Sequence, residues 1–317
     1  MTLTKNSAQT YKLDIGCGRY KKAGLLGIDI ANIPGVDFIL DMEKESIPLP
    51  NQSVDYVFSS HFLEHIPAIQ NFFTEIGRLC VDGAQVEIWT PWGFHNTAFF
   101  FSHKNYMTEE VWKNFCIISR DNHLEFLGRV RWQLEHINYV IPRFVIEEIT
   151  AQGFSLDFAL RYFKNIATEF GVFIKICRNI DTLPVIPLIT YSCTRNGERY
   201  PLKDFTRNFK QGIPYPILVQ FSLEKVYQSF SPFPAILFGT GELSDYFYRV
   251  FDREKIVPQG YFDNDGSRWG KEKNGLKIMK PSLIKNTKII VASSFDKEIS
   301  TQLLALGYAE KDILNLL

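Results

Sequence analysis

The stretch Tyr11–Ile30, YKLDIGCGRYKKAGLLGIDI, decides the fold. A short apolar strand runs into a glycine turn at residues 16–18, and a second apolar strand over residues 25–30 carries Asp29 near its end. Glycine lets the backbone approach a ligand where a Cβ atom would collide. An acid at the tip of the next strand can accept hydrogen bonds from both hydroxyls of a ribose. The stretch therefore predicts a nucleoside-binding crevice at the carboxyl ends of parallel strands.

Strand and helix patterns alternate along the first half of the chain. Phe72, Ile76 and Leu79 recur at helical spacing, and Asp82-Gly83 ends that helix. Such alternation favours an α/β fold with a mainly parallel sheet covered by helices. We expect strands over 36–42, 55–60 and 84–90, helices over 71–80 and 142–153, and a closing antiparallel hairpin over 162–167 and 170–177.

Composition narrows the class of protein. The chain has 317 residues, enough for two ordinary domains, and its 35 Lys+Arg balance its 35 Asp+Glu. A net charge of zero gives no bulk attraction to nucleic acid or to an anionic membrane. The five cysteines are scattered without a CxxC pair, which is typical of reduced thiols in a cytoplasmic protein. No apolar stretch reaches the roughly 18 residues of a membrane span.

Four motifs in order resemble a known family. LDIGCG (13–18), LLGIDI (25–30), LDMEKESIPLPNQSVDYVFSSHFLEHI (40–66) and the helix, Asp-Gly and strand that follow are similar to the short class I S-adenosylmethionine-dependent methyltransferases. These are type 11-like enzymes, often associated with bacterial glycan biosynthesis. The resemblance covers about residues 10–180. It implies a Rossmann-like methyltransferase domain over 1–180, with a substrate lid at 92–141. The following residues, 181–233, are rich in Pro, Tyr and polar side chains and are expected to form a connector.

The same resemblance assigns the cofactor-binding residues for S-adenosylmethionine. It implies that Asp14, Gly16 and Gly18 line the methionine end, that Asp29 binds the ribose, that Asp41 faces the adenine, and that Ser59 and His61 lie beside the sulfonium. One departure is that Gly18 and Asp29 are too close for the usual first helix, so another segment must cover that face of the sheet. Read without the glycine turn, Asp29 and Asp41 would be solvated loop acids.

The motif His61-x-x-Glu64-His65 supplies the first candidates for catalysis. A hydroxyl acceptor must lose a proton, and a histidine or carboxylate can take it. The motif also matches the HxxEH zinc-peptidase pattern, but that chemistry needs both histidines on a helix, and here the motif begins at a strand end. Some related methyltransferases hold a divalent ion with a Glu-x-x-Glu-His cluster. His61 stands where the first Glu would be, so we expect no metal. The alternative role for Glu64 and His65 is to brace the following helix.

Residues 92–141 are rich in aromatic side chains. The segment holds eleven aromatics and four of the six histidines. Aromatic faces suit sugar rings or flat acceptors, although most of these side chains are expected in the core. We name His95 and His136 as candidate acceptor bases.

The strand–turn–helix pattern restarts at residue 235. AILFGTGELSDYFYRVF carries Gly239 and Gly241, and Asp263 follows 22 residues after Gly241, close to the dinucleotide spacing. Ser244 stands where the third glycine would be, and only three strands are expected. This half resembles the Rossmann-like modules appended to sugar-modifying enzymes. We expect a small domain over 234–317 with a structural role or as the contact of a homo-oligomer. A nucleotide or nucleotide sugar is the alternative.

The leading interpretation is an S-adenosylmethionine-dependent methyltransferase acting on a hydroxyl or amine of a sugar or glycan precursor. One alternative is a non-catalytic nucleotide-binding scaffold of a glycan pathway, against which the intact Asp14, Gly16, Gly18 and Asp29 argue. Another is a nicotinamide-linked sugar oxidoreductase working through residues 234–317. The absence of a Tyr-x-x-x-Lys pair after Gly241 opposes its short-chain version.

Overall fold

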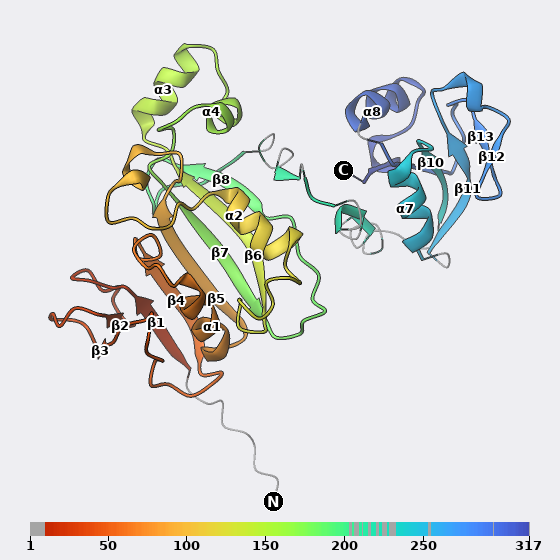
Figure 1. The fold of residues 1–317 in the computed structure, drawn as a ribbon. Coiled ribbons are helices and arrows are strands. Elements are labelled where there is room, and N and C mark those ends of the chain that lie inside the picture. Colours follow the sequence, from red (N-terminus) through yellow and green to blue (C-terminus); the bar gives the residue numbers. More distant parts are fainter. Residues whose placement is uncertain are drawn as a thin grey trace, which may run out of the picture. The chain divides into compact units, whose positions relative to one another are not determined.

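The computed structural model describes residues 10–202, 233–252, 255–293 and 295–316, and between them residues 205, 209–210, 212–214, 217–219, 222–223 and 227. The chain divides into two compact units, Met1–Gln211 and Gly212–Leu317 (Figure 1). Each unit has its own sheet.

The first unit is built on a sheet with the strand order β3-β2-β1-β4-β5-β7-β6-β8-β9. Strands β1 to β5 are mutually parallel, and β7 is antiparallel to both β5 and β6. The predicted α/β class, mostly parallel with an antiparallel closing element, is confirmed. The strands are β1 (Tyr11–Ile15), β2 (Leu26–Asp29), β3 (Phe38–Ile39), β4 (Val54–Ser60), β5 (Cys80–Pro91), β6 (Arg131–Val140), β7 (Glu169–Cys177), β8 (Leu188–Ser192) and β9 (Tyr200–Pro201).

The antiparallel partner of β7 on the side away from β5 differs from the prediction. It is β6, which lies inside the segment expected to be a lid, and not residues 162–167. Trp132 and Leu134 are buried in β6, and so are Ile137 and Tyr139, but the register shifts between Leu134 and His136. That irregularity breaks the period-two pattern that would have revealed a strand. Strands β8 and β9 likewise fall in the expected connector and pair with the sheet.

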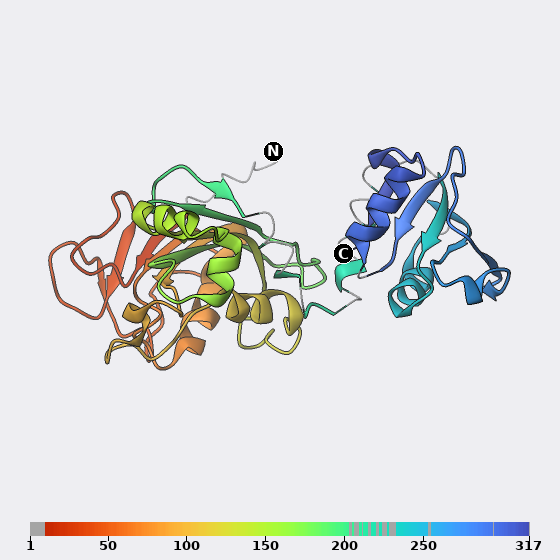
Figure 2. The ribbon, with the colours of Figure 1, turned by 90° about the horizontal axis from the view of Figure 1, so that it is seen from above.

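Helices cover one face of this sheet. Helix α1 (Ile69–Leu79) and helix α2 (Glu109–Lys113), which continues into the π-helix η2 (Asn114–Ile118), lie in front of the sheet in Figure 1 and on the same side of it in Figure 2. Phe73 of α1 contacts Trp112 and Trp132, with ring centroids 6.0 and 4.9 Å away. Both tryptophans are buried, so these aromatics of the expected lid belong to the core.

The other face is covered differently, because no helix separates β1 from β2. Three cationic side chains lie over its aromatic rings: Lys22 over Phe58 at 4.0 Å, Arg195 over Trp89 at 4.8 Å and Arg199 over Phe173 at 4.6 Å. Cation–π contacts of this kind shield an aromatic surface without a helix. The loop at residues 19–24 and the segment after β8 thus supply the cover that the short β1–β2 connection leaves out.

Two further helices follow β6. Helix α3 (Arg143–Ala151) agrees with the predicted helix over 142–153, and α4 (Leu156–Tyr162) comes next. Both lie beyond the end of the sheet at which β6 finishes (Figure 1). The short 3-10 helix η1 (Asn96–Phe99) follows β5 near the same end.

The second unit has the strand order β12-β13-β11-β10-β14-β15. All of these strands run parallel except β12. The expectation of three strands is therefore wrong, because the short strands β13 and β15 extend the sheet. The elements are β10 (Phe233–Phe238), α7 (Glu242–Val250), β11 (Ile256–Phe262), β12 (Glu272–Lys273), β13 (Leu276–Met279), β14 (Lys288–Val291), α8 (Asp296–Ala305) and β15 (Ile313–Asn315).

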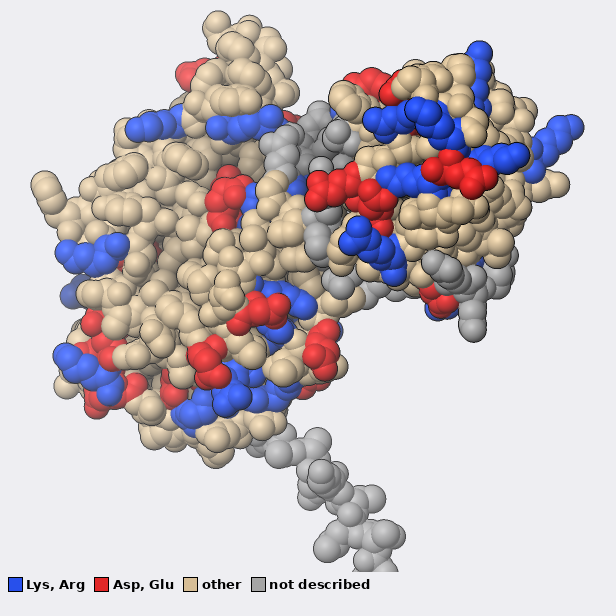
Figure 3. Space-filling view, turned by 45° about the vertical axis from the view of Figure 1, so that its right-hand side comes forward, with Lys and Arg blue, Asp and Glu red and all other residues tan. Residues whose placement is uncertain are grey.

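The surface agrees with the balanced composition. On the face shown in Figure 3, acidic and basic side chains are interspersed. Among the described residues, no helix is long and apolar enough to cross a membrane.

Candidate active site

A cavity of about 530 Å³ opens where β1 and β4 end. The glycine turn forms one part of its wall, and the end of β4 forms another. Charged and polar side chains complete it. The lining includes Asp14, Gly16, Gly18, Lys22, Phe58, Ser60, His61, Glu87, Arg195 and Asn196.

The two glycines of the turn have different structural roles. Gly16 has a φ of 70°, and a Cβ atom there would lie 2.4 Å from Cγ of Phe62. Gly18 has a φ of 51°, and nothing lies within 4 Å of the position of its missing Cβ. Gly16 is therefore needed for packing, whereas Gly18 leaves open space beside the backbone. Such a cradle fits a ligand that approaches the main chain.

Asp29 braces this turn from the end of β2. Its Oδ2 accepts a hydrogen bond from the Gly18 amide at 2.8 Å, and its Oδ1 accepts one from the Ala31 amide at 2.9 Å. A carboxylate has about four lone-pair sites, so both oxygens can accept further bonds from a ligand. Asp29 is not itself among the residues that line the cavity.

Asp14 is buried in β1, with 2% of its surface exposed. The sequence requires a partner for such an acid, and the partner is the Lys22 amide, which donates to Oδ2 at 2.6 Å. Burial raises the pKa of Asp14, and the hydrogen bond from the Lys22 amide opposes that rise. This bond also fixes the loop that replaces the first helix.

Two further residues expected to bind the cofactor, besides Asp29, are outside the cavity wall. Ser59 is fully buried and is not part of the cavity wall, whereas Phe58 and Ser60 line it. The reason is strand alternation, which points neighbouring residues to opposite faces. Asp41 follows β3 and binds its own loop through the Glu43 amide at 3.0 Å and Lys44 at 2.7 Å. It is likewise absent from the lining.

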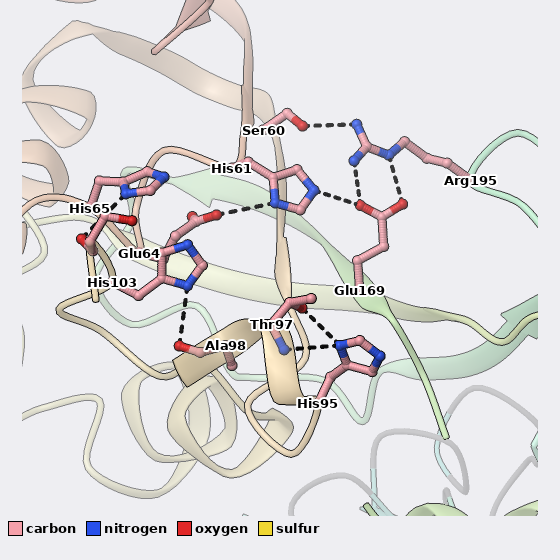
Figure 4. Close-up of polar contacts among 11 residues, drawn as sticks. Ser60, His61, Glu64, His65, His95, Thr97, Ala98, His103, Glu169 and Arg195 are labelled. Carbon is pink, nitrogen blue, oxygen red and sulfur yellow. Dashed lines mark hydrogen bonds and ion pairs between the residues drawn. The ribbon is translucent and has the colours of Figure 1, made fainter. Parts of the chain in front are cut away.

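His61 lies between two carboxylates (Figure 4). Its Nδ1 is 3.1 Å from Oε1 of Glu64, and its Nε2 is 2.9 Å from Oε2 of Glu169. The hydrogen bonds to these two carboxylates raise the pKa of His61 to about 9, and the bond to Glu169 contributes most. The ring is therefore an imidazolium at neutral pH, with both nitrogens occupied. It does not fit the role of proton acceptor in which the sequence placed it.

The backbone of His61 is also unusual. Its φ is 53°, in the left-handed region that costs a non-glycine residue of order 1 kcal/mol or more. The His61 amide donates to the Trp89 carbonyl at 2.8 Å, which ties this turn to the end of β5. The bonds to Glu64 and Glu169 hold the ring of a residue whose main chain is strained.

Glu169 and Arg195 complete this network and were not predicted. Arg195 forms an ion pair with Glu169, with Nε 3.1 Å from Oε1, and its Nη1 donates to Oγ of Ser60 at 2.8 Å. Burial pushes the pKa of Glu169 upward, but the bonds from His61 and Arg195 hold it below the ordinary value. No local sequence pattern indicates that these residues belong to the site, since they come from β7 and from the segment after β8.

Glu64 and His65 lie on the other side of His61. Glu64 is 1% exposed, and His65 is exposed. The ring of His65 contacts His103 edge-on, with centroids 4.8 Å apart. His103 was not a candidate from the sequence.

His95 and His136 do not join the cavity wall. Nδ1 of His95 accepts the Thr97 amide at 3.2 Å at the start of η1, and burial lowers the pKa of this histidine. Nδ1 is therefore the unprotonated nitrogen and is already engaged. His136 lies within β6, 2.7 Å from Oγ1 of Thr190, and burial lowers its pKa to about 4. The expectation that either is a ready base is not supported by these contacts.

Comparison with known proteins agrees with this arrangement. Residues 5–88 match the family described as Methyltransferase domain, and residues 234–314 match the family described as C2185-like, N-terminal. No curated protein matches the sequence significantly.

Solved structures of methyltransferases are similar to about half of the chain. A putative methyltransferase from Bacillus halodurans is 14% identical, with 54% of this chain and 93% of that chain covered and a TM-score of 0.35. A SAM-dependent methyltransferase from Archaeoglobus fulgidus is 20% identical, with 53% and 86% covered and a TM-score of 0.36. The phosphoethanolamine N-methyltransferase 2 of Haemonchus contortus, solved with phosphomonomethylethanolamine and S-adenosylhomocysteine, is 17% identical, with 53% and 50% covered and a TM-score of 0.34.

Residues 5–88 of the first unit are thus similar to a methyltransferase domain, and the strand order places their glycine turn at the carboxyl ends of the parallel strands. The cavity fits S-adenosylmethionine, because the Gly18 cradle and the braced turn leave the backbone open to a nucleoside and its amino-acid tail.

Proposed function

We propose that the chain transfers the methyl group of S-adenosylmethionine to a hydroxyl or amine of a sugar or glycan precursor. The observation that carries this is the character of the cavity wall, which adds Ser60, Glu87 and Asn196 to the glycine turn. Hydroxyl-rich molecules are bound by such donors and acceptors. Tyr20 also lines the cavity and is exposed, and its aromatic face suits a sugar ring.

The residues of the turn bind the cofactor in this proposal. Gly16 and Gly18 allow close approach to the main chain, Asp14 stands at the methionine end, and Asp29 accepts bonds from the ribose. The cofactor supplies an electrophilic methyl group. The task of the chain is then chiefly to align the acceptor with that methyl group and to exclude water.

The proton of a hydroxyl acceptor goes to a group other than His61 in this scheme. An imidazolium held by two carboxylates has no lone pair to offer. The carboxylates in the cavity wall are Asp14 and Glu87, and burial raises the pKa of Asp14. A neutral amine acceptor needs no such base. His61 serves instead to fix Glu169, Arg195 and thereby Ser60 at the rim.

The test is an acceptor screen on the full chain. The chain is incubated with S-adenosylmethionine and a panel of amino sugars, nucleotide sugars and simple glycosides, and S-adenosylhomocysteine formation is followed. Formation that depends on a sugar acceptor supports the proposal. Formation with phosphoethanolamine or another non-sugar acceptor alone would overturn the sugar assignment and keep the methyltransferase.

A binding experiment tests the cofactor residues separately. Calorimetry with S-adenosylhomocysteine should show that Asp29→Ala weakens binding by roughly 1.5–3 kcal/mol, the size expected for hydrogen bonds to a charged group. Asp37→Ala is the matched control, because Asp37 also accepts a hydrogen bond from a backbone amide, that of Gly27 at 2.6 Å, whereas Asp29 accepts the amide of Gly18 in the glycine turn that lines the cavity. Equal affinity of Asp29→Ala and the unaltered chain would remove Asp29 from the site.

A further inference from the structure

Glu64, His65 and His103 converge beside the cavity. Each offers one ligand atom, and these three atoms lie within 4.8 Å of one another. Figure 4 shows the two imidazole rings gathered around the Glu64 carboxylate. The first two residues follow β4, and the third follows η1, so the chain brings together two segments almost 40 residues apart.

Hydrogen bonds clamp these two segments. The amides of Lys104 and Asn105 donate to the Glu64 carbonyl at 2.6 and 3.2 Å. The side chain of Asn105 donates to the carbonyls of Leu63 and Ile66 at 2.8 and 2.7 Å. His103 is thereby held next to Glu64 by its neighbours, so the cluster is formed by the fold and not by chance contact of long side chains.

The hydrogen bonds of the two rings set their tautomers. Nδ1 of His103 lies 3.1 Å from the Ala98 carbonyl, and Nδ1 of His65 lies 3.4 Å from the Ser102 carbonyl. A carbonyl oxygen only accepts, so each Nδ1 carries the proton and each Nε2 keeps a lone pair. This is the arrangement of histidines that ligate metals, where a backbone carbonyl orients the ring through its other nitrogen.

Only one of the two oxygens of the Glu64 carboxylate has a hydrogen-bond partner among the described residues. Oε1 is bound by His61, but Oε2 is buried and has no hydrogen-bond partner among the residues the structure describes. An unpaired buried carboxylate oxygen is costly. A cation on Oε2 would remove that cost while leaving the His61 bond intact, as ligating carboxylates are commonly hydrogen-bonded through the other oxygen.

We propose that Glu64, His65 and His103 bind one divalent transition-metal ion, with Zn²⁺ the best match to two imidazoles and a carboxylate. In tetrahedral geometry, bonds of about 2.0–2.2 Å place ligand atoms about 3.3–3.6 Å apart, so separations of up to 4.8 Å in the present cluster close by as much as about 1.3 Å when the ion binds. Three protein ligands leave a position open for water or an acceptor oxygen. Metal binding here does not depend on the proposed methyl transfer. It replaces the expectation of no metal, because His103 supplies the ligand that the local motif lacks.

Cobalt is the probe for the test, since its visible d–d absorption reports the ligand set directly. The full chain is treated with EDTA, the EDTA is removed by dialysis, and Co²⁺ is added with the absorption followed, after which Zn²⁺ is added as competitor. We expect one equivalent of Co²⁺ to bind and Zn²⁺ to displace it. His103→Ala and Glu64→Gln should each weaken binding at least tenfold, the range seen for loss of groups in a metal site.

The controls separate ligand loss from misfolding. His65→Ala removes an exposed ring, so it should weaken Co²⁺ binding while leaving the circular dichroism unchanged. His123→Ala removes a histidine that binds Asn114 outside the cluster and should bind Co²⁺ as the unaltered chain does. Absence of Co²⁺ binding to the unaltered chain, or equal binding by His65→Ala, His103→Ala and His123→Ala, would overturn the site.

Discussion

Nε2 of His61 lies 2.9 Å from Oε2 of Glu169, a residue 108 positions later in the chain. This contact decides the charge of the imidazole at the mouth of the cofactor cavity. The position of His61 at the end of the fourth strand suggests a general base, but a histidine bound by two carboxylates is a cation. In the function that we propose, His61 therefore positions other groups and does not take a proton.

The charge of His61 can be measured directly. NMR titration of the ring resonances should give His61 a pKa of about 9 and His136 a pKa of about 4. Glu169→Gln should bring the pKa of His61 down, because the first of its two carboxylate partners becomes neutral. A His61 pKa near 6.5 in the unaltered chain would contradict the ion network.

Stability should depend on pH through the same residue. The folded pKa of His61 is raised from 6.5 to about 9, so its contribution is fully present below pH 6.5 and is lost as the pH rises through 9. Its side chain is 44% exposed, so solvent screening limits the effect to the order of 1 kcal/mol. Denaturant unfolding at pH 6 and pH 10 should show that His61→Asn costs more at pH 6. The same cost at both values would mean that the charge contributes nothing.

The two glycines of the turn should respond differently to alanine. Both have positive φ, so both variants carry the same kind of backbone strain, but only Gly16→Ala also drives a Cβ into Phe62. Overpacking of this kind adds about 1–3 kcal/mol. Gly16→Ala should therefore unfold more easily than Gly18→Ala, while Gly18→Ala should lose affinity for S-adenosylhomocysteine, because its methyl group enters the cradle. Thermal melts and calorimetry on the pair give the answer. Equal melting temperatures would exclude the Phe62 collision.

The second unit should not bind nicotinamide cofactors. A cavity of about 500 Å³ lies at its glycine turn, but Asp263, at the position of a ribose acid, is bound there by Thr240 and by Arg268 at 3.4 Å. Ser244 also replaces the third glycine of the dinucleotide motif. Saturation-transfer NMR of the full chain with NAD or NADP as the only added ligand should give no signal. Clear signal from either, lost on Asp263→Ala, would restore the oxidoreductase alternative.

The sequence predicts the parts of the fold that are local. The glycine turn, helix α1 and the succession of the first five strands follow from short patterns. The predicted helix stop is wrong, because α1 ends at Leu79 and Asp82-Gly83 lies inside β5. Strand β6 was missed because a register shift hides its period, and β13 and β15 because very short strands carry almost no pattern.

The site was harder to predict for a different reason. Asp14 and Gly16 belong to one motif and could be named, whereas Glu169, Arg195 and His103 reach the site from three separate segments. Ser59 was named in place of its neighbour Ser60, because the face toward which a strand residue points depends on the whole sheet. Charge states are even harder to predict from the sequence, since the pKa of His61 depends on a partner 108 residues away.

The division of the chain into two compact units, each with a separate sheet, bears on how it melts. Such a chain need not unfold in a single cooperative step, and heating is expected to give two heat-absorption peaks in calorimetry. Substitutions at His61, Gly16 or Glu64 should move the peak of the first unit and leave that of the second in place. The melting peak of the second unit is then an internal reference, and destabilisation of the first unit can be measured against it in a single scan.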